Sequence, residues 1–272
     1  MDDAALLEAF DTQIRRTPDE SPGFRADVLA DPAPMIWVTP VAADASWGGG
    51  VFWCDLDKSN ADAAIAATVE HFRPLGREFE WKHYAYDRPA DLTDRLRAAG
   101  FEPDNEEALV IGEVDVVRER LAGAPPPAGI TVRRLREDRE GAAADWQGVN
   151  DLNRAVWDED STDMTTAVAA SMAADPQGTS MWLAVADDGT VVCAARANFH
   201  EGTDFASLWG GSTLEEYRGR GIYKSLVARR ADEAAERGFR FLQVDASPDS
   251  RPILERLGLR MLTATTPWNW RP

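Results

Sequence analysis

The run Glu216-Tyr217-Arg218-Gly219-Arg220-Gly221-Ile222-Tyr223-Lys224 decides how this chain folds in its second half. It follows an apolar stretch, Phe205 to Gly211, and opens a helical pattern that continues from Leu226 to Ala235. A strand, a tight glycine turn and a helix N-terminus in this order form a pyrophosphate cradle, because the first amides of a helix have no partner inside it. Gly219 and Gly221 permit positive φ and leave no Cβ to hold a phosphate away.

The charge of this run is opposite to that of the chain. The 272 residues carry a formal net charge of -18, whereas Arg218, Arg220 and Lys224 concentrate positive charge at the start of the helix. The helix dipole adds roughly 0.3–1 kcal/mol for each negative group held there. The sequence therefore predicts that this turn binds an anion.

Two familiar phosphate-binding loops do not fit the run. The dinucleotide fingerprint G-x-G-x-x-G would need a third glycine where Lys224 stands, and the spacing of the nucleotide-triphosphate loop G-x-x-x-x-G-K-[ST] is absent. The run instead follows the pattern [QR]-x-x-G-x-[GA] of acyl-CoA pyrophosphate loops, with Glu216 in place of the usual glutamine or arginine.

At these residues the chain resembles the GNAT superfamily of acyl-CoA-dependent N-acetyltransferases, and the resemblance extends from Ile130 to about Trp270. A second signature follows the strand expected at 239–244: Ser247 to Leu259 looks like the family's short helix that ends in leucine, glycine and an aromatic residue. The resemblance implies an α/β fold with a mixed, mostly antiparallel sheet flanked by helices.

A proline-rich linker, Ala124 to Gly129, divides the chain, so that we expect domains at 1–122 and 130–272 joined by residues 123–129. Behind the linker the patterns predict the following elements: a strand at 130–135, a helix at 139–157, a helix at 163–174 capped by Asp163, a hairpin of strands 181–186 and 191–199 across Asp187-Asp188-Gly189-Thr190, a strand at 205–212, and a helix that ends at Arg237 before Gly238.

The front half has a weaker pattern. It predicts strands at 35–41 and 50–54, a helix at 61–72, a strand at 78–85, a helix at 92–99 and a strand pair within 101–113, with Phe79, Trp81, His83 and Ala85 on one face of the strand at 78–85. Residues 96–101 echo residues 254–259. A shortened, degenerate GNAT-like domain is therefore expected here, and its lack of a glycine-basic loop predicts that it does not bind CoA through such a cradle.

The resemblance assigns acetyl-CoA as the co-substrate and names the residues that hold it. The amides of Arg220, Gly221, Ile222, Tyr223 and Lys224 would bind the pyrophosphate, with Gly219 and Gly221 making the turn. Ser212, Thr213 and Leu214 match the strand end that pairs with the pantetheine arm, where an amide stabilises the charge of the transition state. Ser247 stands where an asparagine often touches CoA. An ordinary strand end is the other interpretation of residues 212–214.

The general acid and base are not assigned. Many family members use a tyrosine acid at the position of Leu254, which cannot donate a proton. Tyr223, Ser250 or a water are the substitutes, although Tyr223 also suits helix packing and Ser250 a helix cap. For the base, Phe205 occupies the position of a glutamate used by histone-type members. The nearby acids are Asp204, Asp158, Glu159 and Asp160, and each fits a solvated loop charge better than a base.

Composition narrows the class of protein. A hydrophobic content of 44% predicts a packed core. The pI near 4.6 argues against nucleic acid and anionic membranes as partners. Cys54 and Cys193 are too few for a disulfide framework, and the three scattered histidines suggest no metal site. The start of the chain lacks a signal-peptide layout and no apolar run reaches spanning length, so that a cytoplasmic protein is expected.

Three functions remain open. The leading hypothesis is an N-acetyltransferase that moves an acetyl or similar acyl group from acyl-CoA to a primary amine on a small molecule or peptide, by direct attack in a ternary complex. Trp157 and Trp182 are candidates for the wall of its acceptor pocket. The second is a non-catalytic acyl-CoA-binding or regulatory module. The third, acyl transfer from aminoacyl-tRNA, is disfavoured by the negative charge. The sequence does not reveal the acceptor or the oligomeric state.

Overall fold

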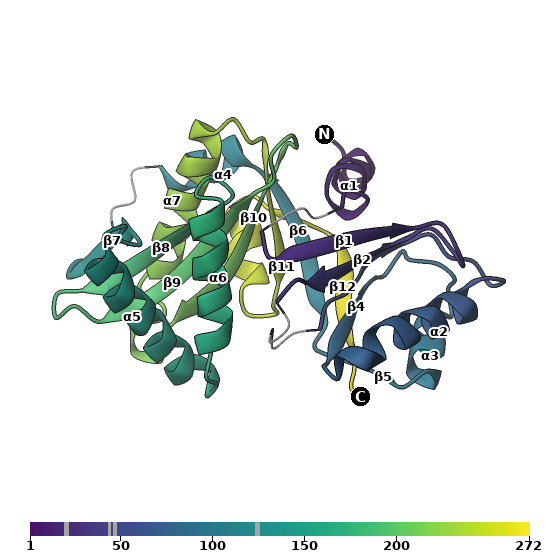
Figure 1. Cartoon of the computed structure of the whole chain (residues 1–272). Helices are drawn as coiled ribbons and strands as arrows, with labels where there is room; N and C mark the ends of the chain where they lie inside the picture. Colours follow the sequence, from purple (N-terminus) through teal and green to yellow (C-terminus); the bar gives the residue numbers. More distant parts are fainter. Residues whose placement is uncertain (19–21, 43–44, 46–47, 123–125) are drawn as a thin grey trace. The chain divides into compact units, whose positions relative to one another are not determined.

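The computed structural model describes residues 1–18, 22–42, 45, 48–122 and 126–272. It divides into two compact units. Unit 1 comprises Met1–Val110, Asp245–Pro252 and Met261–Pro272; unit 2 comprises Ile111–Val244 and Ile253–Arg260 (Figure 1). This division differs from the one expected at the proline-rich linker, whose residues 123–125 lie outside the described part. The C-terminal strand accounts for much of the difference, because it joins the sheet of unit 1.

Unit 2 contains a mixed sheet in the order β11-β10-β9-β8-β7. Its strands are β7 (Ile130–Arg134), β8 (Thr179–Ala186), β9 (Val191–Phe199), β10 (Phe205–Thr213) and β11 (Phe241–Ala246), of which the last two residues of β11 belong to unit 1. All neighbours are antiparallel except β10 and β11, which pair in parallel. The predicted hairpin of β8 and β9 is confirmed, with Gly189 at φ +90° in its turn.

Helices cover both faces of this sheet. They are α4 (Val114–Leu121), α5 (Arg139–Trp157), α6 (Thr162–Ala174), α7 (Ile222–Glu236) and the short α8 (Arg251–Arg256), which begins in unit 1. Leu152 of α5 packs in one cluster with Leu183, whereas Leu226 of α7 packs in another with Ala184. Because neighbouring strand residues point to opposite faces, α5 and α7 lie on opposite sides of β8, as Figure 1 shows.

Unit 1 contains a sheet in the order β1-β2-β3-β4-β12, with β5 paired to β12. Its strands are β1 (Phe24–Leu29), β2 (Met35–Pro40), β3 (Gly50–Cys54), β4 (Phe79–Tyr84), β5 (Phe101–Pro103) and β12 (Arg260–Trp270); β6 (Glu107–Glu113) is shared between the units. Its helical segments are α1 (Asp3–Phe10), the π-helical turn η1 (Asp11–Arg15), α2 (Ala61–Phe72), the 3-10 turn η2 (Arg73–Leu75) and α3 (Leu92–Ala98).

Both faces of β4 are covered. On one face Phe79 stacks on Phe72 of α2, with their ring centroids 4.7 Å apart, and on the other Tyr84 meets Phe10 of α1 at 6.2 Å. The predicted one-sided alternation along 78–85 is therefore only partly right, because Lys82 and Tyr84 are also buried. The Lys82 ammonium lies 2.7 Å from Glu107 and 3.3 Å from Asp245, so its charge is paired.

The remaining differences from the predicted elements have local causes. Helix α6 begins at Thr162 with Ser161 in the N-cap position, so that Asp163 lies in the first turn and is not the cap. The neighbouring Asp160 carboxylate accepts the Thr162 amide at 3.0 Å. Strand β11 begins at Phe241 instead of 239, because the Phe239 amide still donates to the Ala234 carbonyl at the end of α7.

The two units share one succession of elements. In unit 2, β8, β9 and β10 are antiparallel neighbours, and α7 then leads to β11, which is parallel to β10. In unit 1, β1, β2 and β3 are antiparallel neighbours, and α2 then leads to β4, which is parallel to β3. The same topology thus occurs twice in the chain.

Candidate cofactor-binding site

The glycine turn before α7 adopts the backbone that the sequence predicts. Gly219 has φ +74° and Gly221 has φ +85°, and both residues are exposed. No heavy atom lies within 4 Å of the position that a Cβ would occupy at either residue. The main chain of the turn is therefore open to a ligand, and an L side chain there would carry backbone strain.

The start of α7 leaves amides without partners inside the helix. Gly221 is the N-cap residue and has no side chain to accept a hydrogen bond, and the Ser225 amide makes the first helical bond, 3.1 Å to the Gly221 carbonyl. The amides of Ile222, Tyr223 and Lys224 therefore find no acceptor within α7. No acidic residue lies in this first turn. The arrangement favours an anion.

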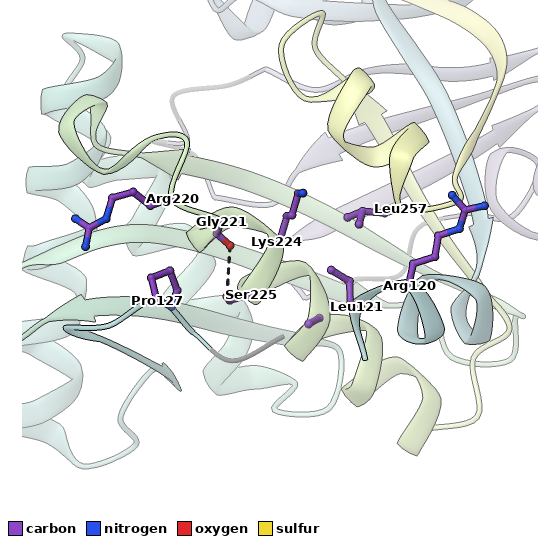
Figure 2. A pocket seen from close by; sticks show the side chains of 9 residues that line it. Arg120, Leu121, Pro127, Arg220, Gly221, Lys224, Ser225 and Leu257 are labelled. Carbon is purple, nitrogen blue, oxygen red and sulfur yellow. Dashed lines mark hydrogen bonds between the residues drawn. The ribbon is translucent and has the colours of Figure 1, made fainter. Parts of the chain in front are cut away.

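A cavity of about 230 Å³ opens at this helix start (Figure 2). It is lined by residues of α7, α4, the turn and the segments next to them: Arg120, Leu121, Pro127, Arg220, Gly221, Lys224, Ser225, Ala228 and Leu257. The charged residues of this lining are Arg120, Arg220 and Lys224, and all three are basic. The cavity thus joins main-chain donors with positive charge.

The three basic residues of the turn, Arg218, Arg220 and Lys224, differ in what their side chains contact. Arg220 and Lys224 line the cavity, and the Arg220 guanidinium also lies 5.0 Å from the centre of the Tyr217 ring. The Arg218 side chain instead donates its Nε hydrogen to the Thr213 carbonyl at 3.1 Å. Arg218 therefore braces the loop against the end of β10, and the two other residues supply the charge of the cavity.

A β-bulge interrupts the pairing of β10 with β9 next to the turn. Its register shifts between Trp209 and Ser212, and Gly210 within it has φ +63°. The ring of Tyr223 packs directly on this bulge, since a Cβ on Gly211 would lie 2.6 Å from Tyr223 Cε2. Burial raises the pKa of the Tyr223 phenol. The Tyr223 ring thus packs on the bulge, and its hydroxyl stays protonated at neutral pH.

Arg230 ties α7 to the strands beside this bulge. It is 1% exposed, and it donates from Nε to the Leu226 carbonyl and from Nη1 to the Arg196 carbonyl, both at 3.1 Å. Arg196 pairs with Trp209, the last residue before the register shift. Burial lowers the pKa of Arg230. An arginine in a helical pattern normally indicates solvent, so only a structure reveals this role.

Most polar groups at the end of β10 already have hydrogen-bond partners within the protein. The buried Ser212 hydroxyl accepts the Trp157 indole N–H at 2.9 Å and donates to Asn153 Oδ1 at 3.3 Å. The Thr213 hydroxyl lies 3.1 Å from Cys193 Sγ. The Leu214 amide donates to the Val192 carbonyl and its carbonyl accepts the Tyr217 amide. A contact of Leu214 with the cofactor would therefore use its side chain.

The loop between α5 and α6 places its acids in solvent. Asp158, at φ +56°, Glu159 and Asp160 are all exposed. Hydrogen bonds from Thr162 lower the pKa of Asp160, which makes it a weaker base. Trp157 at the end of α5 is 60% exposed, whereas Trp182 donates its indole N–H to the Glu233 carboxylate at 2.8 Å. Of the two tryptophans, Trp157 is therefore the more accessible.

The second signature falls partly in each unit. Ser247 and Ser250 belong to unit 1, and the Ser247 hydroxyl accepts the Ser250 amide at 3.3 Å, which is a helix-cap contact. Leu254 is fully buried in unit 2 and donates no proton. The roles of Ser247 and Ser250 toward CoA remain predictions. Within the described residues, no group of histidine, cysteine and acidic side chains is arranged to hold a metal.

Asp204 and Phe205 stand at the start of β10, at its other end from the bulge. Phe205 is fully buried, and the Asp204 carboxylate pairs with the Arg240 guanidinium at 3.3 Å. Neither residue thus resembles a free base at the glycine turn. Among the helices in the described ranges, none has the length and apolar character needed to span a bilayer.

Comparisons with known proteins agree with this geometry. Residues 146–259 match the profile of the Acetyltransferase (GNAT) family. The matched residues include the glycine turn and α7. No curated protein matches the chain.

Solved structures match over nearly its whole length. A GCN5-related N-acetyltransferase from Kribbella flavida has 17% identity and a TM-score of 0.63, with 99% of this chain and 94% of that one covered. A tandem GNAT protein from the clavulanic acid biosynthesis pathway has 15% identity and a TM-score of 0.61, with 95% and 86% covered. A functionally unknown protein from Staphylococcus epidermidis has 11% identity and a TM-score of 0.63, with 90% and 94% covered. The chain therefore has the fold of the GCN5-related N-acetyltransferases, and its residues 146–259 carry the sequence profile of that family.

Proposed function

We propose that this protein transfers an acetyl group, or a close acyl analogue, from acyl-CoA to a primary amine. The observation that carries the proposal is the open turn at Gly219 and Gly221, which joins unpartnered amides of α7 to a cavity whose charged residues are all basic. These groups suit the diphosphate of CoA, because main-chain donors and positive charge both stabilise phosphate oxygens. Ser212, Thr213 and Leu214 at the end of β10 would lie along the pantetheine arm.

Each part of the site has a role in the proposed reaction. Acyl-CoA supplies an acyl group activated as a thioester. The acceptor nitrogen attacks its carbonyl carbon, so that a C–N bond forms and the C–S bond breaks, with no covalent intermediate on the protein. The leaving thiolate needs a proton, and the protonated Tyr223 phenol beside the bulge is our candidate donor, with Ser250 as the alternative. The general base that would remove the proton from the acceptor ammonium is not assigned.

Binding of acetyl-CoA, measured by titration calorimetry, tests the cofactor claim. In the variant Gly221→Val a branched side chain would fill the cradle, and we expect at least a tenfold loss of affinity. The control is Gly189→Val in the β8–β9 turn, which imposes similar strain at φ +90° with nothing within 4 Å. Wild-type protein that fails to bind acetyl-CoA would contradict the proposal.

A non-catalytic acyl-CoA-binding module is the second candidate. The observation that favours it is Leu254, which is fully buried where many family members have a tyrosine acid. Release of free thiol from acetyl-CoA, followed across a panel of amines, separates the two functions. Sustained release with any amine supports the transferase, and tight binding without release across the panel supports the module.

We further propose that unit 1 is a degenerate GNAT-like half. Its α2 (N-cap Asn60) stands in the succession where α7 stands in unit 2, but a carboxylate lies just ahead of its N-terminus. The Asp57 carboxylate accepts the Ser59 hydroxyl at 2.6 Å and the amides of Ser59 at 2.7 Å and Asn60 at 3.3 Å. These hydrogen bonds, that of the Ser59 hydroxyl first, lower the pKa of Asp57, so its negative charge persists close to the start of α2 and disfavours a phosphate there.

A further inference from the structure

Arg120 lines the cavity at the glycine turn although it precedes the region that matches the acetyltransferase profile. It lies in the last turn of α4, whereas the match begins at residue 146. Its guanidinium is held in place by donation from Nη1 to the Arg256 carbonyl at 2.9 Å. No carboxylate of the described residues forms an ion pair with it. Its charge is therefore positioned and unneutralised.

Arg118, two residues earlier on the same helix, provides the contrast. Its guanidinium lies 3.0 Å from Asp232 and 3.5 Å from Asp115, so its charge is already paired. It lines a second, larger cavity of about 760 Å³ between α4 and α7. That cavity shares Leu121, Ser225 and Ala228 with the cavity at the turn. The two cavities thus adjoin each other along α7.

The basic residues of the cavity are separated along α7. Figure 2 shows Arg220 and Gly221 toward one end, Lys224 between, and Arg120 beyond Leu121 at the other end. From Gly221 to Ala228, which also lines the cavity, α7 rises by about 10 Å. The positive charge of Arg120 therefore lies apart from the amides of the turn, with Leu121 and Leu257 near it.

CoA carries two anionic groups that a ribose separates: the diphosphate and the ribose 3′-phosphate. If the diphosphate occupies the turn, as the proposed function requires, the second anionic group reaches along α7. We propose that Arg120 binds the 3′-phosphate of CoA, so that α4 completes the cofactor site from outside the matched region. The inference rests on the proposed function and adds a residue that distinguishes the phosphorylated ribose of CoA from an unphosphorylated one.

The test compares CoA with 3′-dephospho-CoA, which differ only in this phosphate. Dissociation constants are measured by calorimetry for the wild type, Arg120→Met and the control Arg118→Met. We expect the wild type to prefer CoA about tenfold. Arg120→Met should lose that preference by weakening CoA binding alone, with dephospho-CoA binding unchanged. Arg118→Met should keep the preference, because Asp232 and Asp115 already neutralise that guanidinium.

Several outcomes would overturn the inference. A wild type that binds the two ligands equally has no 3′-phosphate site. A loss that is equal for both ligands in Arg120→Met assigns Arg120 to the diphosphate or to the fold, and an unchanged preference removes it from the site. If Arg120→Met does not fold, Arg120→Gln replaces it, since its amide can still donate to the Arg256 carbonyl. Binding of either ligand by the wild type leaves the proposed function standing in all these cases.

Discussion

Asp145 is a buried carboxylate that holds helix α5 against the end of strand β7 in unit 2. It is 2% exposed and joins α5 to the end of β7 through Arg133, at 2.7 and 2.8 Å, and Arg136, at 2.8 and 3.2 Å. Burial alone would raise the pKa of Asp145, but the hydrogen bonds from both arginines outweigh it and hold the pKa far below its usual range. The ionised carboxylate is therefore part of the folded structure.

Replacing this carboxylate should destabilise the protein in a pH-dependent way. Asp145→Asn leaves two guanidinium groups with a weaker acceptor, and we expect a loss of about 2 kcal/mol in the free energy of unfolding at pH 7. Because the pKa of folded Asp145 lies below its unfolded value of ~3.9, the stabilisation is present above that pH and is lost as the pH falls. Urea unfolding at pH 7 and pH 3 measures both effects.

The matched control is Asp188→Asn, an exposed carboxylate in the β8–β9 turn. It should change the free energy of unfolding by less than about 0.5 kcal/mol at either pH. A difference between wild type and Asp145→Asn that does not shrink at pH 3 would show that the charge of Asp145 is not what stabilises the fold.

At the scale of elements, local signals predicted local structure. Helices α2 and α5 have the bounds that their apolar spacing predicts, and Gly238 at φ +84° follows α7 as predicted. Helix α4 was missed, because its eight residues include three β-branched valines and the linker follows at once. Strand β12 was missed as a partner of β4, since pairing residues 265–270 with residues 79–84 is a long-range choice.

In the candidate site, too, features that depend on local sequence could be predicted and features that depend on long-range packing could not. The positive φ of Gly219 and Gly221 and the free amides of α7 follow from the order of strand, glycines and helix, which is local information. The contributions of Arg120 and Arg230 depend on which helix lies beside which, and no spacing in the sequence encodes that. Arg218 was expected to face the anion, but a carbonyl of its own loop, that of Thr213, takes its Nε hydrogen.

The contact between the β10 bulge and α7 predicts a rescue experiment. Gly211→Ala would place a methyl group 2.6 Å from Tyr223 Cε2, so the ring or the bulge must move, and we expect about 1–3 kcal/mol of destabilisation. Tyr223→Leu removes the ring, so the double variant should recover at least ~1 kcal/mol relative to additivity. Thermal unfolding of the four proteins measures the coupling. Additive losses would mean that the two residues do not meet.

At the scale of the whole chain, one topology occurs twice with different helix starts. Unit 2 begins α7 after two glycines at positive φ, whereas unit 1 begins α2 after Asp57, whose carboxylate accepts the amides of Ser59 and Asn60 just before the helix. The formal net charge of the chain is -18, whereas the charged residues that line the cavity at the turn are all basic. The start of α7 thus suits a phosphate, and the start of α2 lies close to a carboxylate.

We expect one acetyl-CoA to bind per chain. The reason is the contrast between the helix starts: an anion at α2 would meet the nearby Asp57 carboxylate, whose pKa is lowered by hydrogen bonds from the Ser59 hydroxyl and from the amides of Ser59 and Asn60. Calorimetric titration of the full chain should give a stoichiometry near one, and Gly221→Val should leave no residual site. Asp57→Asn removes the charge without creating a glycine turn and should keep the stoichiometry at one. Binding of a second equivalent that survives Gly221→Val would place a functional cofactor site in unit 1 and would contradict its assignment as a degenerate half.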